Sequence, residues 1–586
     1  DSYGNPTAGT SVNFEVNSWP GGADGQAVLP GSCITLGNGQ ASTIFTFGNA
    51  AGEYKVTATS GTLTGSPITF TAMAFTPAAL NKISGDGVSN TVTSTVDITA
   101  QLVNDSGFGI GGEDIVFSII QYPDGATGQG VLPGSDTTDS NGDALTVLTL
   151  GNKIGNYVVR ADYNSGILTA DFTITATPAS PYQVALTGPG SVGAGEVSTV
   201  FTVTVQDQYG NLSNVTADTL FSVQTTAGGT GGFYSDSLGA NPITSRAIST
   251  GSNTAVFYYK DTSIGDPTIT VTRVSGQDLS VVSDTLDISV IPGGLSYFAV
   301  TGDNSIMSAG ESRVITVTAY DVENNPKTDL TQMNVYFSGA NASPSPSQVI
   351  PTCSNNNSVD TAFGSVVLLE FTNGAATTEL KVYDVETVHI KAMNDPTSPT
   401  VTTSDSQDLD IVVGHGSAKY LKFSADIPVP AGDFLAGIEF PLGELRAMDL
   451  YDNLCDGADV PANGYSGTKA VNYTLSGTAD APDGSAVDIW TNNVAFTAGV
   501  STTVLNATLY RAQDTAITAA GSDLTGINIA SNVITVSAGV ISKLSFYEQP
   551  ATSCLTNTNL VQQPVVAVAD QYGNPVFAAS DQITIS

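Results

Sequence analysis

The 586-residue sequence predicts an all-β protein, built as a tandem array of antiparallel β-sandwiches. Runs of five to eight residues alternate between apolar and polar side chains, as in residues 199–205 (TVFTVTV) and 53–58 (EYKVTA), and end at clusters of Gly, Asn, Asp or Pro. Helical periodicity is nearly absent. One turn motif recurs at intervals of 103 to 128 residues, which is close to the length of a seven-stranded sandwich.

The recurring turn is clearest at residues 570–575, which read DQYGNP and lie after an alternating apolar run. Gly and Asn supply the positive φ values of a tight turn, and Pro fixes φ at the exit. The other copies are residues 1–6 (DSYGNP) and 207–211 (DQYGN), with weaker forms at 104–107 (NDSG), 321–326 (DVENNP) and 449–453 (DLYDN).

The turn period and the short linkers divide the chain into successive units. Short linkers that contain proline restrict the swivel between domains, so we expect a semi-rigid rod. A sandwich strand rises roughly 30 Å, and five units end to end would reach about 150 to 200 Å. The predicted units are residues 1–76, which lack the opening strands, 77–178, 179–292, 293–414, 415–540 and a partial unit, 541–586.

Charge and hydropathy exclude several classes of partner. Acidic residues outnumber basic ones by 54 to 17, giving a net charge of -37. Nucleic acids and anionic membranes are bound by clustered Lys and Arg, so we expect neither as a partner. No run of 18 apolar residues occurs, and no membrane span is predicted in this segment. An acidic surface does favour solubility and the attraction of Ca²⁺.

The four cysteines do not make a disulfide framework in a chain of this length. Cys33 and Cys353 both lie 32 residues after the Asp of their turn, so they are equivalent positions in two repeats and are not expected to pair with each other. Isolated thiols are the simpler interpretation. A bridge from Cys353 to Cys455 across a junction between units stays open.

A family resemblance becomes visible when the turn is combined with two later motifs. The first unit has NGQA at residues 38–41 and GEYKVTA at 52–58, and the second has NGDA at 141–144 and GNYVVRA at 155–161. Together these motifs resemble the bacterial immunoglobulin-like repeats of invasin- and intimin-type surface proteins. The resemblance implies immunoglobulin-like sandwiches in an extracellular, cell-surface protein, where such modules serve mainly as spacers and display scaffolds. It is clear in the first three units and the last, whereas units four and five carry longer insertions.

The sequence offers no catalytic motif, and we predict that the chain is not an enzyme. Residues 107–112 and 188–193 both fit G-x-G-x-x-G, but nucleotide binding requires a helix after the motif, and both lie between predicted strands. The two histidines, His389 and His415, have no third ligand at zinc spacing. No G-x-S-x-G nucleophile elbow occurs.

Calcium is the strongest metal hypothesis. Asp139, Asn141 and Asp143 offer oxygen ligands at alternate positions around a sharp turn at Gly142, as a hard cation prefers. A calcium loop normally adds a distant bidentate carboxylate, and none lies at the expected spacing. Asn-Gly is also an ordinary hairpin turn. The metal site and the plain turn both remain open at this point.

Three aromatic residues are candidates for binding a partner. Trp19, Tyr122 and Trp490 are predicted to lie in or near loops. Exposed aromatic rings stack on sugars or anchor protein partners. The alternative interpretation is that each ring covers the end of its own sandwich.

The combined expectation is a structural rod of an extracellular surface filament or adhesin, which acts as a spacer in adhesion or cell-surface assembly. One alternative is a module that binds polysaccharide or a cell-surface receptor through its loops, and another is a sheath or lattice subunit. Expected partners are other copies of the chain or neighbouring repeats of a longer chain. The chain opens at a turn and stops 16 residues after the last turn begins. Either its tail completes the head of another molecule, or the sequence is a stretch of a longer array.

Overall fold

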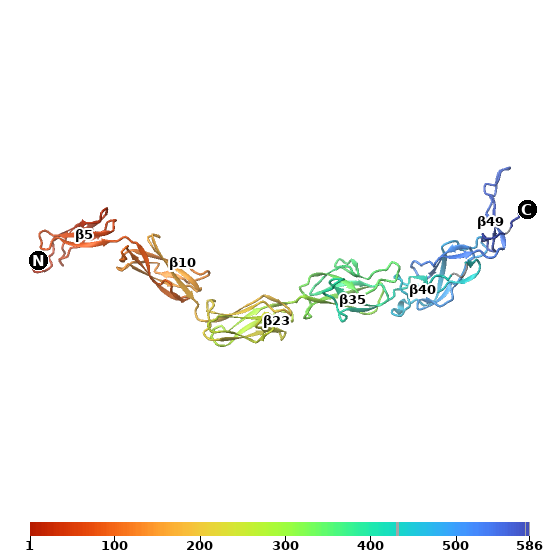
Figure 1. The fold of residues 1–586 in the computed structure, drawn as a ribbon, viewed down its shortest axis with the longest axis horizontal. Coiled ribbons are helices and arrows are strands. Elements are labelled where there is room, and N and C mark those ends of the chain that lie inside the picture. The colour runs from red at the N-terminus through yellow and green to blue at the C-terminus, as the bar shows by residue number, and fades with distance from the viewer. Residues whose placement is uncertain (429–432, 581, 585–586) are drawn as a thin grey trace.

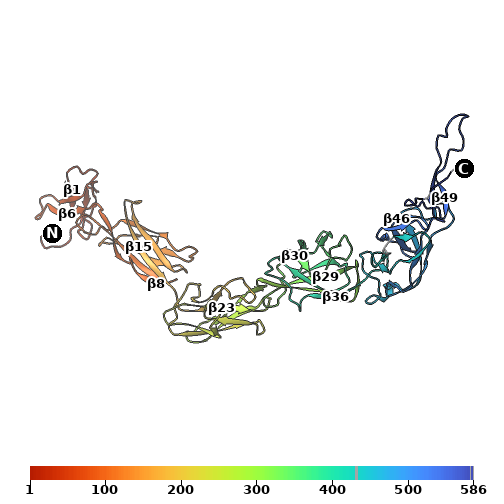
Figure 2. The same ribbon diagram turned by 45° about the vertical axis from the view of Figure 1, so that its right-hand side comes forward.

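The computed structural model describes residues 1–428, 433–580 and 582–584, and shows compact β-rich units joined end to end in an elongated array (Figure 1). The array keeps its extended shape when it is turned by 45° (Figure 2). Among the described residues the only helical element is the short 3₁₀ turn η1 (Pro461–Asn463). None of them forms a helix of the length and apolar character that crossing a membrane would require.

The second unit is a complete two-sheet sandwich. Its strands are β7 (Ala79–Ser84), β8 (Ser89–Thr91), β9 (Thr95–Val103), β10 (Asp114–Gln121), β11 (Gly130–Leu132), β12 (Ser135–Thr137), β13 (Asp143–Thr149), β14 (Gly155–Tyr163) and β15 (Leu168–Thr177). One sheet has the order β12-β10-β14-β15-β8, and the other has the order β11-β13-β9-β7. Alternate side chains enter the core, so Ile98 and Leu102 on β9 are fully buried, as are Tyr157 and Val159 on β14.

The third unit uses the same plan with more short edge strands. They are β16 (Gln183–Thr187), β17 (Ser191–Gly193), β18 (Phe201–Gln206), β19 (Thr219–Thr225), β20 (Gly231–Tyr234), β21 (Pro242–Ile243), β22 (Ser245–Ile248), β23 (Thr254–Asp261), β24 (Thr268–Ser275), β25 (Ser283–Asp287) and β26 (Ser289–Ile291). The main sheets are β16-β18-β23-β20-β21 and β22-β19-β24-β25. Between them, Phe201 stacks on Phe257 with ring centroids 5.1 Å apart.

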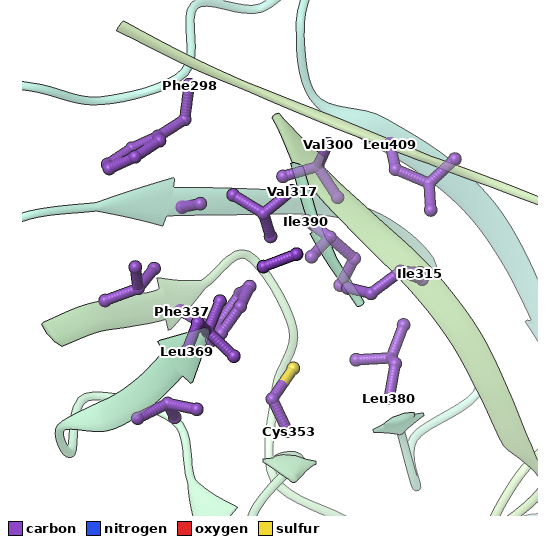
Figure 3. Close-up of a cluster of buried hydrophobic side chains, with 14 of the residues drawn as sticks. Phe298, Val300, Ile315, Val317, Phe337, Cys353, Leu369, Leu380, Ile390 and Leu409 are labelled. Carbon is purple, nitrogen blue, oxygen red and sulfur yellow. The ribbon is translucent and has the colours of Figure 1, made fainter. Parts of the chain in front are cut away.

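The fourth unit has two five-stranded sheets, β27-β29-β34-β31-β32 and β28-β36-β35-β30-β33. Its core gathers side chains from both sheets, among them Phe298, Ile315, Phe337 and Cys353 (Figure 3). The strands are β27 (Leu295–Gly302), β28 (Met307–Ser308), β29 (Ser312–Asp321), β30 (Gln332–Ser338), β31 (Thr352–Ser354), β32 (Asp360–Ala362), β33 (Val367–Glu370), β34 (Ala375–Lys381), β35 (Thr387–Met393) and β36 (Leu409–Gly414).

The fifth unit is the most divided, with sheets β37-β40-β44-β43-β41-β47, β38-β48-β46 and β39-β45-β42. It still closes around one buried cluster that includes Leu421, Phe440 and Phe496. The strands are β37 (Tyr420–Phe423), β38 (Phe434–Leu435), β39 (Glu439–Pro441), β40 (Leu445–Met448), β41 (Gly467–Leu475), β42 (Ile489–Trp490), β43 (Asn493–Thr497), β44 (Val500–Ser501), β45 (Asn506–Thr508), β46 (Gln513–Thr515), β47 (Ile517–Gly521) and β48 (Ile534–Ser537).

The two ends of the array are partial units. Residues 1–76 form β1 (Ser11–Ser18), β2 (Ala27–Leu29), β3 (Ser32–Ile34), β4 (Ile44–Thr46), β5 (Gly52–Thr59) and β6 (Ile68–Ala74), in the orders β3-β1-β5-β6 and β2-β4. These match β12-β10-β14-β15 and β11-β13 of the second unit. The tail is a hairpin of β49 (Lys543–Glu548) and β50 (Val565–Ala569), which matches the pair β7 and β9.

One parallel pairing recurs within these antiparallel sheets. The short second strand of each complete unit pairs in parallel with its last strand, as β8 does with β15, β17 with β26, β28 with β36 and β38 with β48. Four separate buried clusters, one in each complete unit, show that every sandwich has a core of its own. The chain is therefore all-β, a tandem array of immunoglobulin-like β-sandwiches, as the sequence predicts.

Candidate functional site: the junctions between units

The recurring turn lies where one unit meets the next, and its first residue organises it. In the third unit, Oδ1 of Asp207 accepts hydrogen bonds from the backbone N–H groups of Tyr209 and Asn211, both at 2.9 Å. Oδ2 accepts the N–H of the linker residue Ala179 at 3.0 Å and the side-chain amide of Asn211 at 2.9 Å. Asp207 is fully buried, so its carboxylate has lost its hydration. The four hydrogen-bond donors compensate for this loss.

Three later turns repeat this arrangement atom for atom. In each, Oδ1 of the Asp accepts hydrogen bonds from two backbone N–H groups of its own turn. Oδ2 accepts one from a linker N–H and one from the Asn side-chain amide. The Asp residues are 0 to 1% exposed. They are Asp321 with the linker residue Gly293, Asp449 with Gly416 and Asp570 with Gly539, at 2.8 to 3.0 Å from the linker nitrogen.

The Asn at the fifth position of the turn contacts the preceding unit. Nδ2 of each Asn has two hydrogens, and the one that the Asp does not accept is donated across the junction to a backbone carbonyl. We call each set of Asp, Asn and carbonyl the junction clamp. The four clamps join Asn211 to the carbonyl of Asn152 at 2.9 Å, and Asn325 to that of Thr262, Asn453 to that of Tyr383 and Asn574 to that of Tyr510, each at 2.8 Å.

The third residue of the turn packs beside the clamp. Tyr451 lies 4.8 Å from Tyr383 of the preceding unit, and Tyr572 lies 4.8 Å from Tyr510, measured between ring centroids. Tyr451 also lies so close to Gly310 that a Cβ there would be 2.3 Å from its hydroxyl. Glycine is therefore required at position 310, both for this close approach and for its φ of +79°.

The electrostatics of the clamp at Asp321 favour an ionised carboxylate. Burial acts to raise the pKa of Asp321, but hydrogen bonds from Asn325, Gly293 and Glu323 outweigh it, and the pKa lies below the usual value for an Asp. The clamp at that junction therefore holds its charge at neutral pH. Its bonds are shielded from water, which makes them stronger than equivalent exposed bonds.

The junction between the fourth and fifth units has additional contacts. His415 in the linker is 1% exposed, and its Nε2 accepts the N–H of Gly457 at 2.8 Å. The amide of Asn463, at the end of η1, donates to the carbonyl of His415 at 3.2 Å and to the hydroxyl of Ser308 at 3.4 Å. A loop of the fifth unit thus covers the linker and also touches the fourth unit.

The residues proposed for calcium form a turn of the same type. Oδ1 of Asp139 accepts the N–H groups of Asn141 and Asp143 at 2.8 and 3.0 Å, and its Oδ2 accepts the Asn141 amide at 3.3 Å. These bonds hold the pKa of Asp139 below its usual value. No group of three or more His, Cys, Asp or Glu residues placed to hold a metal occurs in the described parts of the chain. Calcium at Asp139, Asn141 and Asp143 stays a prediction.

The three aromatic candidates lie in separate units and are not brought together. Trp19 and Tyr122 hold equivalent places, immediately after β1 and β10, and are 47% and 49% exposed. Trp490 is instead part of the short strand β42 and stacks on Tyr473, with ring centroids 4.9 Å apart. It covers the core of its own unit. Partner binding by Trp19, Tyr122 and Trp490 stays a prediction.

The four cysteines are free thiols. Cys353 is fully buried in the core of the fourth unit, where burial raises the pKa of its thiol. His389 lies on the outer face of β35, and its Nδ1 is 2.6 Å from Asp410 on the neighbouring strand. Cys353 and His389 therefore make these contacts within the fourth unit.

Sequence reasoning identified the turns but missed what they bind. The acceptors in the preceding units are backbone carbonyls. Because every residue has a backbone carbonyl, the sequence does not show which one accepts the bond. One signal was present: Ala-Gly directly follows the short second strand of units three to five, at residues 194–195, 309–310 and 436–437, and the next turn packs against the glycine.

No protein-family model matches the chain, and no curated protein matches it either. Similar solved structures include the Escherichia coli adhesin FdeC, with 17% identity, 58% of this chain and 100% of that chain covered, and a TM-score of 0.33. Invasin, a bacterial integrin-binding protein, has 14% identity, covers 80% of this chain and 82% of its own, and gives a TM-score of 0.30. Domains 4–9 of the surface layer protein SbsC have 16% identity, 97% and 81% coverage, and a TM-score of 0.21. Invasin and intimin, whose repeats the sequence resembles, are thus both among the structural neighbours.

Proposed function

We propose that this chain is a stiff spacer array of a bacterial cell-surface adhesin or surface structure. In this role it holds a binding end, or a lateral surface, at a distance from the cell. Its action is mechanical: every complete unit is a self-contained sandwich, and each clamp fixes the angle to the preceding unit. The resemblance of the turn motifs to invasin- and intimin-type repeats supports a place outside the cell.

The observation that carries the proposal is the repetition of one clamp at four successive junctions. A chain of independent binding modules needs no fixed angle between neighbours. Here the same two side chains and the same backbone groups recur at each of these junctions within 0.1 Å in the crossing bond. The complete units have separate cores, and the crossing bonds join consecutive units, as in other quasi-linear repeat proteins.

The stiffness of the array is tested by removing the crossing bonds. In the full chain, Asn211, Asn325, Asn453 and Asn574 are each replaced by Ala, and small-angle X-ray scattering compares the maximum dimension with that of the unchanged protein. We expect a shorter and broader distance distribution. The matched control is Asn5→Ala, because the Asn5 amide bonds only to Asp1 within its own turn. Unchanged scattering of the fourfold variant would show that the junction clamps do not stiffen the array.

The cell-surface location of the protein is tested on intact cells that produce it. We expect added protease to digest the chain without lysis of the cells, and antibodies against it to label their surface. Protection of the chain until the cells are lysed would contradict the surface role, whatever the stiffness of the array.

A further inference from the structure

The junction between the first and second units differs from the four that follow it. Asn104 stands where the clamp has Asp, and Phe108 stands where the clamp has Asn. Oδ1 of Asn104 accepts the N–H groups of Ser106 and Phe108 at 3.0 and 2.8 Å, so the turn itself still forms. The amide nitrogen of Asn104 replaces the second carboxylate oxygen, and Phe108 has no amide to donate across the junction.

No hydrogen bond joins residues 1–76 to residues 77–178, and both segments are fully described. The contact at this place is between two phenyl rings, Phe75 of the linker and Phe108 of the turn, with centroids 6.5 Å apart and planes inclined by 25°. Phe75 is 40% and Phe108 63% exposed, so the rings exclude little water. Such a contact is not directional, and it tolerates rotation that a buried hydrogen bond does not.

A crevice of about 420 Å³ opens at this junction, lined by Met73, Phe75 and Pro77 on the linker side and by Asn104 and Ser106 of the turn. The crevice at the last junction, where the clamp is present, is smaller, at about 280 Å³. The first junction therefore lacks hydrogen bonds between its two units and is more loosely packed than the last junction.

We propose that the junction of the first and second units is a hinge built into an otherwise clamped array. The pair Asn104 and Phe108 sets it, since these two residues remove the linker bond and the crossing bond together. The hinge goes beyond the spacer role: it assigns bending to one junction and lets the first unit reorient while the following units keep a common direction.

The test measures distances between units in the full chain by pulsed electron spin resonance. Cys33 and Cys554 are replaced by Ser, because Cys554 is exposed and Cys33 partly so, while Cys353 and Cys455 are buried. One labelled pair, Ser18→Cys with Ser118→Cys, spans the first junction, and a second pair, Ser118→Cys with Ser191→Cys, spans the second junction. We expect the first distribution to be at least about twice as wide as the second.

Exchange of the clamp residues between the two junctions makes the test specific. Asp207→Asn with Asn211→Phe installs the hinge residues at the second junction and is expected to broaden the second distribution. Asn104→Asp with Phe108→Asn is the reciprocal change and is expected to narrow the first. Equally narrow distributions at both junctions of the unchanged protein, or no broadening in the first exchange, would overturn the hinge. Broad distributions at both junctions would instead contradict the stiff spacer, so the two proposals fail in different ways.

Discussion

Single residues decide how far the turn can depart from its DQYGNP form. The fourth position needs a positive φ, which Gly210 and Gly573 adopt at +80° and +87° without steric cost. In units four and five, Asn324 and Asp452 hold the same conformation at +66° and +73°. Asn and Asp tolerate the left-handed region better than other residues with a Cβ. The motif that looks weakened in the sequence is therefore intact in structure.

Asp488, just before β42, is a residue whose charge works against folding. It is 9% exposed, and its Oδ1 accepts the N–H of Tyr510 at 3.0 Å. Its Oδ2 is buried without a hydrogen-bond partner among the described residues. Burial, with a smaller effect of the charge on Asp480, raises the pKa of Asp488 to about 6. The folded fifth unit therefore prefers the protonated form.

We expect Asp488→Asn to stabilise the fifth unit at neutral pH. The pKa is raised on folding, so the unfavourable contribution of the charged form is absent below the unfolded value, near 4, and develops as pH rises through about 6. A shift of about two pKa units corresponds to about 2 to 3 kcal/mol at pH 8. Thermal unfolding should show this gain at pH 8 and none at pH 4. Asp124→Asn, in an exposed loop of the second unit, is the control, and a gain that persists at pH 4 would contradict this account.

At the scale of the element, the clamp turn has two separable functions. The Asp fixes the turn within its own unit and ties it to the linker, whereas the Asn amide provides the bond to the preceding unit. The turn at residues 449–453 shows the division well. Asp449 accepts the N–H groups of Gly416, Tyr451 and Asn453, whereas the Asn453 amide donates the hydrogen bond to the carbonyl of Tyr383.

Substitutions at this turn should therefore separate folding from docking. Asp449→Ala leaves three N–H groups without their carboxylate acceptor, and we expect a loss of about 2 to 4 kcal/mol in the stability of the fifth unit. Asn453→Ala removes one crossing bond, and we expect a loss of about 1 kcal/mol with a wider angle between units four and five. Calorimetry of the full chain reports the first effect, and distance measurements across the junction report the second. Equal effects of both variants on unfolding would show that the turn acts as one unit.

The limits of sequence reasoning lie at this same scale. The turns were predictable because Gly, Asn and Pro are required by backbone geometry, and the strands because alternation follows the pleat. The partner of each Asn was not, because any residue can present the carbonyl that Asn152 or Thr262 provides. Trp490 was placed near a loop, whereas its pairing in β42 with Ala507 and its packing on Tyr473 depend on neighbours distant in the sequence.

At the scale of the whole molecule, two physical effects extend the array. The clamps fix the angle between neighbours through short-range hydrogen bonds. The net charge of -37 is spread along the chain, and like charges repel one another and favour separation of the units. The two effects differ in their response to salt, because only the repulsion between exposed charges is screened.

Raising the ionic strength should therefore reveal which effect keeps the array extended. In 1 M NaCl the screening length falls to about 3 Å, which removes repulsion between units. If the clamps set the shape, the maximum dimension from X-ray scattering stays within about 10% of its low-salt value, since buried hydrogen bonds are little affected by salt. The fourfold Asn→Ala variant, in which repulsion alone extends the chain, should contract clearly in the same salt. A comparable contraction of the unchanged protein would show that charge, and not the junction clamp, determines its length.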